Sequence, residues 1–369
     1  MDYDQKKISE VLNRFGIGHD SFAVETLRSG HINATYKIDV CYQGKSDSYI
    51  LQKVNTYVFS DPVGIMSNIA KVTGHIRNKL IQEGVDPTGR VLNFVTREDG
   101  TNYYNEGTGF WRIYHYVSDT VTYNKAEDLG ILRNAGTSFG IFQKQLSDFP
   151  MDELIDTLPN FHNTPARMEN FFRACERDVM GRSKEVEKEL ALFRENEELW
   201  SILEKDRQAG RLPLRVTHND TKYNNILIHK KTGEAACVID LDTVNPGLCA
   251  YDFGDAIRFS ANKTLEDDPD LSKVGLDLEL YEAFASGFIP VVKDFCSPRE
   301  LESLALGAVT MTFEVGVRFL EDYVNGDKYF KIGRPLHNLE RGRNQLALAL
   351  DMKKHLDQMQ EINRALSSK

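Results

Sequence analysis

The sequence predicts a mixed α/β fold of the α+β type, with an N-terminal antiparallel sheet and a mostly helical C-terminal part. Short apolar and β-branched runs separated by turn residues dominate the first third of the chain. After about residue 120, apolar residues recur instead at helical intervals. One short island of strands, over residues 214–242, interrupts the helical part. We therefore expect two domains, residues 1–117 and residues 118–369.

The first domain is expected to be a sheet with one helix. Its predicted strands cover residues 22–27, 34–40, 48–54, 91–95 and 110–117, with turns at Gly30 and at residues 43–45. The predicted helix covers residues 63–80, because its apolar residues follow a helical spacing.

The second domain is expected to be helical around its island of strands. Its predicted helices cover residues 129–146, 184–203, 278–288, 300–323 and 339–366. Ala135, Gly136 and Gly140 are small residues on the first of these helices, which predicts close packing against another helix. The island is predicted to contain strands 214–217, 226–229 and 235–239, the last two joined by a turn at residues 230–234.

Composition excludes several classes of protein. Lys and Arg number 45 against 55 Asp and Glu, a formal net charge of −10, which argues against a nucleic-acid partner but not against a nucleotide ligand. No apolar run approaches the roughly 20 residues of a membrane span, and the start of the chain does not resemble a signal peptide. The five cysteines are odd in number and widely spaced, so we expect reduced thiols in the cytoplasm. The sequence leaves the oligomeric state open, with a monomer as one reading.

The island of strands carries the residues of a phosphoryl-transfer site. Residues 218–225 read H-x-D-x-K-x-x-N, and the strand over residues 235–239 ends on Asp240. Transfer from ATP needs a base for the acceptor hydroxyl, hard oxygen ligands for Mg²⁺ and a cation near the migrating phosphoryl group. Asp220 is the candidate base, Lys222 the cation, and Asn225 and Asp240 the metal ligands. The spacing is that of the protein-kinase catalytic loop.

Three neighbouring residues are ambiguous. His218 is expected to fix the loop through hydrogen bonds rather than to transfer protons. Asp242 is either a second metal ligand or the cap of the next element. Asp252, in Tyr251-Asp-Phe-Gly-Asp255, resembles a D-F-G metal motif, but Asp240 already occupies the metal position. We therefore expect Asp252 to cap the following helix and to brace the catalytic loop.

The sequence resembles the aminoglycoside phosphotransferase and choline kinase superfamily, which shares the two-lobed fold of protein kinases. Residues 216–227 and 238–242 match its signatures. Within it, the sequence is most similar to the N-acetylhexosamine 1-kinases, through residues 30–36, 49–56, 161–165, 252–259, 265–267, 318–323 and 329–330. The resemblance implies ATP, Mg²⁺ and a small-molecule sugar substrate that is phosphorylated on its anomeric hydroxyl.

The resemblance also implies roles for particular residues. His31, Arg318 and Tyr329 would help to bind the sugar, with Asp220 near its anomeric hydroxyl. Adenine would be received through backbone groups at His115, Tyr116 and Val117. A cleft between the two lobes would hold the substrates.

The phosphate-binding side is expected to depart from the superfamily. Gly44-Lys45-Ser46 is no Walker A loop, because residue 39 is Asp rather than Gly. The turn that contains Gly30 and Asn33 offers backbone N–H groups for phosphates. Gln52 occupies the strand position that usually carries a phosphate-binding Lys or Arg, and Lys53 is expected to point to the opposite face.

Two rival functions stay open. Helix 63–80 has no acid at its middle, so a Lys–Glu phosphate clamp is not expected, and a non-catalytic nucleotide-binding scaffold is one alternative. The intact catalytic loop argues against it. The other is a kinase of the same superfamily that acts on an aminoglycoside, choline or homoserine. A cationic substrate of that kind would need an acidic pocket, for which Asp267, Asp268 and Asp270 are candidates.

Overall fold

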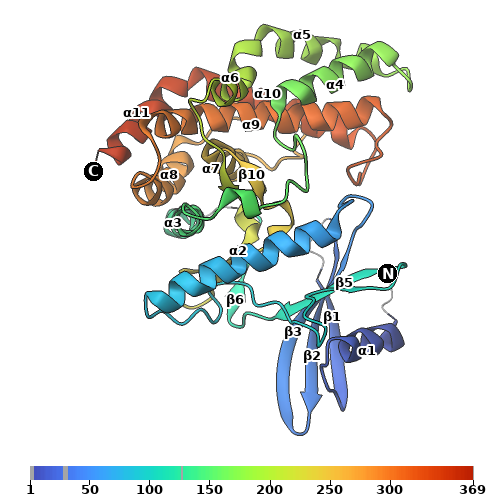
Figure 1. The fold of residues 1–369 in the computed structure, drawn as a ribbon. Helices are drawn as coiled ribbons and strands as arrows, with labels where there is room; N and C mark the ends of the chain where they lie inside the picture. The colour runs from blue at the N-terminus through green and yellow to red at the C-terminus, as the bar shows by residue number, and fades with distance from the viewer. Residues whose placement is uncertain (1–3, 28–31, 126–127, 369) are drawn as a thin grey trace. The chain divides into compact units, whose positions relative to one another are not determined.

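The computed structural model describes residues 4–27, 32–125 and 128–368. The chain forms two compact units, Met1–Thr120 and Val121–Lys369, and Figure 1 shows the sheet in the first unit and the helices in the second. The division falls a little after the predicted boundary at residue 117. Gly30 and His31 lie outside the described residues.

The first unit is built on a five-stranded antiparallel sheet with the order β1-β2-β3-β5-β4. These strands are β1 (Ser21–Leu27), β2 (Ala34–Tyr42), β3 (Lys45–Val54), β4 (Tyr104–Asn105) and β5 (Phe110–His115). The predicted strand over residues 91–95 is wrong, because only an isolated bridge joins Phe94 to Tyr114. The edge of β5 is shared: β4 pairs with Trp111 and Phe110, so neither segment has room for a long ladder.

Two helices, α1 (Gln5–Arg14) and α2 (Pro62–Gln82), accompany this sheet. The unpredicted α1 buries its apolar face in a cluster that includes Leu51, Trp111 and Ile113 of β3 and β5. Because side chains alternate across a strand, Arg112 points the other way, and its Nη1 lies 3.8 Å from the sulfur of Met66 on α2.

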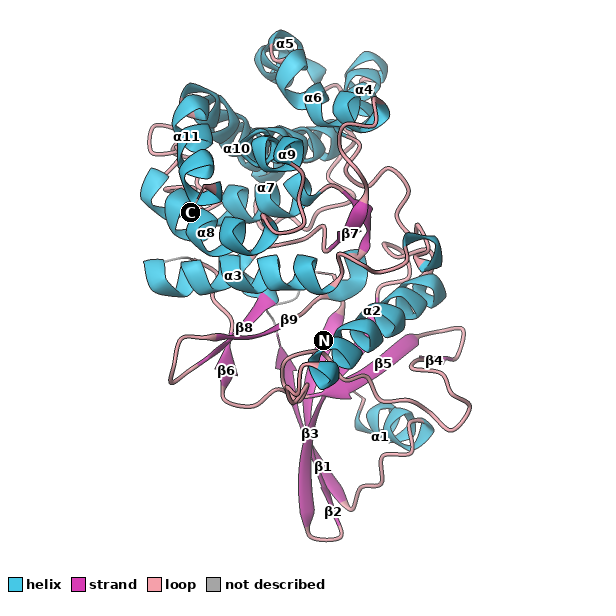
Figure 2. Cartoon of the chain, turned by 60° about the vertical axis from the view of Figure 1, so that its left-hand side comes forward, coloured by secondary structure: helices cyan, strands magenta, loops and turns pink. Residues whose placement is uncertain are grey.

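The second unit is mostly helical (Figure 2). Its helices are α3 (Leu129–Gln145), α4 (Thr164–Arg177), α5 (Glu187–Glu195), α6 (Glu197–Gln208), α7 (Cys249–Ser260), α8 (Leu278–Val292), α9 (Pro298–Val324), α10 (His337–Lys354) and α11 (Leu356–Ser367). Two predicted helices are each divided, at Asn196 and at His355. The side chains of both residues bond a carbonyl four residues earlier, Leu192 and Asp351, and so compete with the helical pattern.

Two pairs of helices, α3 with α8 and α7 with α9, pack closely because glycines lie where the helices cross. A Cβ on Gly136 of α3 would lie 2.2 Å from the carbonyl oxygen of Phe284 on α8, which confirms the expected close packing of α3. A Cβ on Gly254 of α7 would lie 2.3 Å from the carbonyl oxygen of Gly307 on α9. Close contact with α9 thus fixes how deeply α7 lies in the second unit.

Helix α9 runs through the centre of the second unit. It begins with a capping box between Ser297 and Glu300 and extends over 27 residues. Among the described helices it is the one long and apolar enough to cross a membrane, but 94% of its most apolar window is buried inside the protein. Such burial is typical of a core helix. The apolar character therefore serves packing.

The strands of the island are divided between two small sheets, of order β10-β7 and β6-β8-β9, rather than joined in one. Strand β7 (Arg215–Thr217) pairs with the unpredicted β10 (Asn245–Gly247). Strands β8 (Ile226–His229) and β9 (Ala235–Val238) form the predicted hairpin, and the two-residue β6 (Thr120–Val121) precedes α3. The loop between β7 and β8 is therefore anchored at both ends by different partners.

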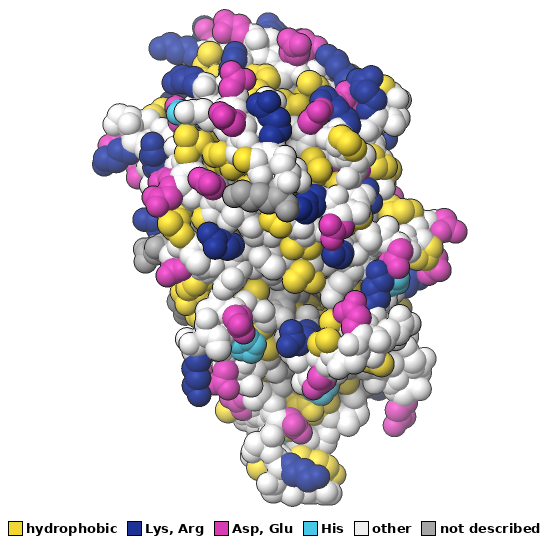
Figure 3. All heavy atoms as spheres, turned by 90° about the vertical axis from the view of Figure 1, so that its left-hand side faces the viewer, with side chains coloured by type: hydrophobic (Ala, Val, Ile, Leu, Met, Phe, Trp, Pro, Cys, Tyr) yellow, Lys and Arg dark blue, Asp and Glu magenta, His cyan; other side chains and the backbone are white. Residues whose placement is uncertain are grey.

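The surface charges and the cysteines can be compared with the expectations from composition. On the face shown in Figure 3, acidic and basic side chains are interspersed, with no continuous basic stripe among the residues drawn in colour. All five cysteines are free, as expected.

Candidate active site

The loop between β7 and β8 brings three of the predicted catalytic side chains together. The Nζ of Lys222 lies 2.7 Å from Oδ1 of Asp220, and the two side chains are 31% and 24% exposed. The Nδ2 of Asn225 donates to the backbone oxygen of Asp220 at 2.8 Å and to its Oδ2 at 3.1 Å. The carboxylate of Asp220 is thus held by two side chains of its own loop and stays open to solvent.

The electrostatic surroundings keep Asp220 ionised. Burial by itself would raise the pKa of this carboxyl group, but the charge and hydrogen bond of Lys222 outweigh it, and the pKa is lowered from the ordinary aspartate value. Burial would likewise lower the pKa of Lys222, and Asp220 with Asp255 raises it instead. Both groups are charged at neutral pH, as a base and a cation for phosphoryl transfer must be.

Asp252 braces the loop from below. Its Oδ2 accepts from the N–H of His218 at 2.9 Å and its Oδ1 from the N–H of Asn219 at 2.7 Å. It stands in the first turn of α7, whose N-cap is Leu248 without a side-chain cap. The bracing role is therefore confirmed, while the expected capping of the helix is wrong, because both carboxylate oxygens bind loop amides.

His218 also fixes the loop, as predicted. Its Nδ1 accepts from the N–H of Asp220 at 3.3 Å, and its Nε2 lies 2.8 Å from the carbonyl oxygen of Ile239. This pattern needs the neutral ring with its proton on Nε2. His218 thereby ties the catalytic loop to the end of β9, where Asp240 follows.

The two predicted metal ligands lie on neighbouring chain segments. The N–H of Ile239 donates to the backbone oxygen of Asn225 at 2.9 Å, which places Asp240 one residue from a direct contact with Asn225. Asp240 is exposed, with φ of 60°, whereas Asp242 is buried in the following 3₁₀ turn. Asp240 is thus the accessible carboxylate of the pair.

The donor chemistry fits a magnesium ion that also binds phosphate. Since Nδ2 of Asn225 donates to Asp220, its amide oxygen is the atom of that group that can serve as a hard oxygen ligand. Among the described residues, no group of three or more His, Cys, Asp or Glu could hold a metal alone. Mg²⁺ is commonly bound by one or two protein carboxylates together with substrate phosphates. A site with only Asn225 and Asp240 as protein ligands is consistent with this coordination.

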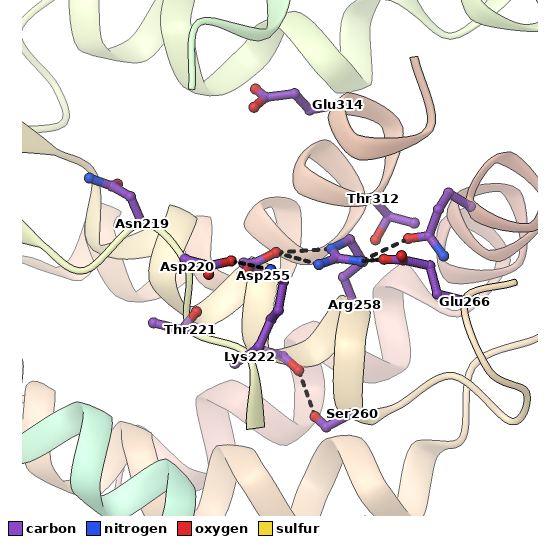
Figure 4. Close-up of polar contacts among 12 residues, drawn as sticks. Asn219, Asp220, Thr221, Lys222, Asp255, Arg258, Ser260, Glu266, Thr312 and Glu314 are labelled. Atoms are coloured by element: carbon purple, nitrogen blue, oxygen red, sulfur yellow. Dashed lines mark hydrogen bonds and ion pairs between the residues drawn. The ribbon is translucent and has the colours of Figure 1, made fainter. Parts of the chain in front are cut away.

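A network of charged side chains extends from Lys222 to helix α7 and to the segment that follows that helix. Figure 4 shows its members next to one another: Asp220, Lys222, Asp255, Arg258 and Glu266. Arg258 donates to Asp255 at 2.9 Å and to Glu266 at 2.5 Å, and it is 2% exposed. Burial would raise the pKa of Glu266, but Arg258 and Arg341 lower it to about 2. Motif spacing gave no signal for this network, which depends on packing between helices.

The predicted sugar-binding residues of α9 and the loop that follows it are also brought together. The guanidinium carbon of Arg318 lies 6.0 Å from the ring centroid of Tyr329, 5.3 Å from that of Phe161 and 5.8 Å from that of Phe330. Tyr329 is 49% exposed. The arrangement presents a cation among aromatic faces, but it shares no direct contact with Asp220.

Asp322 holds the loop that carries Tyr329. Its carboxylate accepts from the backbone N–H of Lys328 at 2.9 Å, of Tyr329 at 2.8 Å and of Phe330 at 2.9 Å. Asn338 donates to the same carboxylate at 2.9 Å. A buried carboxylate thus fixes the backbone of an otherwise exposed loop, a function that the sequence did not reveal.

In the first unit, Gln52 is bound to a buried arginine. The Nε of Arg112 donates to Oε1 of Gln52 at 2.8 Å, and Nε2 of Gln52 donates to Thr35 at 3.1 Å. Lys53 lies on the other face, 5.5 Å from the ring centroid of Trp111, as predicted. Arg112, which sequence reasoning missed, is therefore a buried cation on the face of the sheet that Gln52 occupies.

The other nucleotide candidates are partly committed to internal hydrogen bonds. Oδ1 of Asn33 accepts from the N–H of Asn55 at 2.9 Å. In the proposed adenine segment, the N–H of His115 donates to Asn93 and that of Tyr116 to Ser48, both at 3.0 Å. Adenine recognition would therefore use other backbone groups of this segment, which ends at Val117.

His162 lies beneath the catalytic loop and was missed as a functional residue. Its Nδ1 lies 2.7 Å from Oε1 of Glu314, and its Nε2 lies 3.0 Å from the carbonyl oxygen of Asn219. Thr164 donates to the other oxygen of Glu314 at 2.6 Å. The segment Phe161–Pro165 had stood out only through the family resemblance, because its partners are far away in the sequence.

The second unit also contains a pocket of about 570 Å³ at the C-terminal end of α7. Arg258, Ser260, Lys263 and Glu266 line it, together with residues of α3 and α8. None of the four predicted phosphoryl-transfer residues is among its lining residues. The pocket therefore adjoins Arg258 and Glu266 of the charge network, and the four predicted phosphoryl-transfer residues do not line it.

Comparisons with known proteins agree with this geometry. Several solved structures share the fold at low sequence identity. An ethanolamine kinase of Plasmodium vivax matches with a TM-score of 0.60 and 13% identity, over 95% of this chain and 91% of that one. A choline kinase of Cryptosporidium parvum matches at 0.57 and 15%, over 99% and 100%. A spectinomycin phosphotransferase solved with ADP and spectinomycin matches at 0.56 and 12%, over 97% and 100%.

The sequence itself matches one family over most of its length. The profile of the phosphotransferase enzyme family aligns with residues 23–285. The match includes the sheet of the first unit and the whole catalytic loop with β8 and β9. The protein belongs to the phosphotransferase enzyme family.

Proposed function

We propose that this phosphotransferase transfers the γ-phosphoryl group of ATP to the anomeric hydroxyl of N-acetylhexosamines. The observation that carries the proposal is the half-open carboxylate of Asp220, clamped by Lys222 and Asn225. A base of this kind can orient a hydroxyl group and take its proton. The anomeric hydroxyl is more acidic than an ordinary alcohol, so it suits a carboxylate whose pKa is low.

Each catalytic residue then has one task. Asp220 accepts the proton from the anomeric hydroxyl, and Lys222 offsets charge on the transferred phosphoryl group. Asn225 and Asp240 hold Mg²⁺, which neutralises charge on the nucleotide phosphates. His218 and Asp252 keep the loop rigid, because positioning contributes much of the rate in phosphoryl transfer.

The sugar is proposed to bind near Arg318 and Tyr329. An aromatic face suits the apolar face of a pyranose ring, and a guanidinium group donates hydrogen bonds to hydroxyl and acetamido oxygens. Asp322 supports the site by fixing the backbone of Tyr329. His31 belongs to this proposal through the family resemblance alone.

The nucleotide is proposed to use the candidates of the first unit. The turn at Gly30 and Asn33 and the side chain of Gln52 would lie on the phosphate side, and the segment from His115 to Val117 would receive adenine. Arg112 is bound to Gln52, which supports a positively charged phosphate side without the usual lysine. The five free cysteines support a reducing, cytoplasmic location.

A cationic acceptor is the alternative, and ethanolamine and choline kinases share this fold. The three acidic residues suggested for such an acceptor have other partners in the structure. Asp267 already pairs with Arg334 and His337. Asp270 pairs with Lys273, and Asp268 accepts from the backbone of Asp270. These acids are thus neutralised or bound within their own loop, and they do not form an open acidic pocket among the described residues.

The test is an acceptor panel with phosphate localisation. The protein is incubated with ATP and Mg²⁺ and with N-acetylglucosamine, N-acetylgalactosamine, choline, ethanolamine, homoserine or an aminoglycoside, and ADP formation is measured. Phosphorus NMR of the product then locates the phosphate. We expect turnover of the hexosamines with phosphate on the anomeric oxygen. Turnover of an amino alcohol alone would replace the proposed substrate, phosphate at O6 or O3 would overturn the regiochemistry, and nucleotide binding without turnover would favour the scaffold.

A further inference from the structure

The backbone just before Asp220 adopts an unusual conformation that the protein must hold in place. Asn219 has φ of 63°, in the left-handed region, and it is 4% exposed. A non-glycine residue in this region is strained unless its surroundings determine it. The N–H of Asn219 donates to Asp252, and the side chain of Asn219 forms hydrogen bonds with Thr217 and Thr243. Its carbonyl oxygen is held by His162 at 3.0 Å.

His162 is placed between two acceptors. Its Nε2 faces the carbonyl oxygen of Asn219, and its Nδ1 faces a carboxylate oxygen of Glu314 at 2.7 Å. Neither partner can donate a hydrogen to a ring nitrogen when Glu314 is ionised. Both contacts are therefore satisfied only by an imidazolium ring that carries a proton on each nitrogen.

The surroundings favour this ion pair. Glu314 is 0% exposed in the middle of α9. Complete burial would raise its pKa, yet the pKa is lowered, because His162, Arg167 and Arg318 are near. A buried charge that is paired and hydrogen-bonded on both oxygens is tolerated, whereas an unpaired one is not. Thr164 satisfies the second oxygen.

We propose that His162 is a positioning residue of the phosphotransferase: as an imidazolium anchored on Glu314, it holds the carbonyl oxygen of Asn219 and so fixes the backbone from which Asp220 projects. The inference rests on the proposed role of Asp220 as the base. His162 would act through the backbone of Asn219 and would not contact the substrate. The same pair lies one helical turn from Arg318, so one buried carboxylate lies beside both the loop support and the candidate sugar site.

Two variants separate positioning from mere packing. His162→Asn keeps an amide nitrogen near the position of Nδ1, where it can still donate to Glu314, but it cannot reach Asn219. Thr164→Val, of similar shape, removes the other hydrogen bond to Glu314 and leaves the contact with Asn219 intact. Both changes should destabilise the fold by loss of one buried hydrogen bond. Only the first should alter catalysis.

With the acceptor that the wild type phosphorylates, we expect kcat per folded molecule of His162→Asn to fall by about tenfold to a hundredfold, the effect of losing a hydrogen bond from a charged donor. The KM for ATP should stay within about twofold, because the variant leaves the residues that bind ATP in the ground state unchanged. Thr164→Val should keep its kcat. His162→Gln, whose amide nitrogen reaches as far as Nε2, should recover part of the loss. Equal kcat in His162→Asn and Thr164→Val would overturn the proposal.

Two measurements need no acceptor and so separate this proposal from the proposed function. Nitrogen NMR of the wild type should show both ring nitrogens of His162 protonated at neutral pH, and a neutral ring would refute the anchoring role. Amide hydrogens of Asn219 and Asp220 should exchange faster in His162→Asn than in Thr164→Val. Equal exchange would also refute it. These results stand even if the acceptor panel fails.

Discussion

The side-chain nitrogen of Asn225 donates to Oδ2 of Asp220 at 3.1 Å and to its backbone oxygen at 2.8 Å. One amide thereby does two things. Its nitrogen orients the candidate base, and its oxygen is the proposed ligand for Mg²⁺. The candidate base and the proposed magnesium site would thus share one side chain.

Asp220→Asn should abolish most of the activity of a folded protein. The carboxamide keeps the shape of the side chain but cannot take the proton from the hydroxyl group of the phosphoryl acceptor, so kcat should fall by about 10²–10⁴. The measurement is ADP release with the preferred acceptor. Asp270→Asn, in the exposed pair with Lys273, is the matched control and should keep its activity. A loss below about tenfold would remove Asp220 from the role of base.

Asn225→Ala should raise the Mg²⁺ concentration needed for half-maximal activity. Replacing a residue that only hydrogen-bonds to a metal ligand lowers metal affinity by about tenfold. Replacing a ligand that donates its own oxygen to the metal should lower the affinity by at least as much. A magnesium titration of initial rates measures the shift. Asn224→Ala changes the neighbouring residue, which bonds Asn124 instead, and should show the wild-type requirement. Identical titrations for the two variants would exclude Asn225 from the metal site.

Gln52→Ala should weaken ATP binding and leave the acceptor KM unchanged. Gln52 holds the buried guanidinium group of Arg112 at 2.8 Å, and loss of a hydrogen bond to a charged group costs about 1.5–3 kcal/mol. That cost falls on the stability of the fold, and the KM for ATP should rise by about tenfold because a guanidinium group that Gln52 no longer orients binds the phosphates less well. Lys53→Ala, on the opposite face beside Trp111, is the control. If Lys53→Ala raises the KM for ATP and Gln52→Ala does not, the assignment of faces is wrong.

Asp322→Asn should affect acceptor binding rather than ATP binding. Three backbone N–H groups converge on this carboxylate, and the amide nitrogen of Asn would face some of those donors. The loop with Tyr329 should loosen, and the KM for the acceptor should rise more than kcat falls. Tyr329→Ala removes the ring itself and should give the same rise without the same loss of thermal stability. An unchanged acceptor KM in both variants would move the acceptor site elsewhere.

Glu266 should contribute stability that disappears in acid. Burial by itself would raise its pKa, but Arg258 and Arg341 outweigh burial and bring the pKa to about 2, well below the ordinary glutamate value. The ionised form is therefore favoured in the folded state. This stabilisation is fully present above about pH 4.5 and is lost as the pH falls toward 2, with a size on the order of 3 kcal/mol.

Urea unfolding of wild type and Glu266→Gln at several pH values measures this effect. The difference in unfolding free energy should be largest near neutral pH and should shrink below about pH 4.5, because the wild-type carboxyl group then becomes protonated. Glu302→Gln, on the exposed surface of α9 beside Arg299, is the control with little pH-dependent difference. A difference that does not change with pH would mean that Glu266 is not ionised by its arginine partners.

Local patterns predicted most of the elements. Strands β1, β2, β3 and β5 and helices α2, α3, α8 and α9 follow the alternation or the helical spacing of their own residues. The failures have physical causes. The strand expected at residues 91–95 shares its partner with β4. The helices divided at Asn196 and His355 break where a side chain bonds the helix backbone. Strand β10 pairs with a partner almost 30 residues away, which no short window can show.

The candidate site divides in the same manner. The sequence alone determined the fold class, the family resemblance and the loop with Asp220, Lys222 and Asn225, because those residues lie within eight positions of one another and their chemistry depends on local spacing. Only the tertiary structure decided that His162 and Glu314 support this loop, that Arg112 accompanies Gln52 and that Asp322 fixes the loop of Tyr329. These contacts join distant segments, and a buried polar group takes its partner from whichever helix or strand packs against it, which spacing along the chain does not encode.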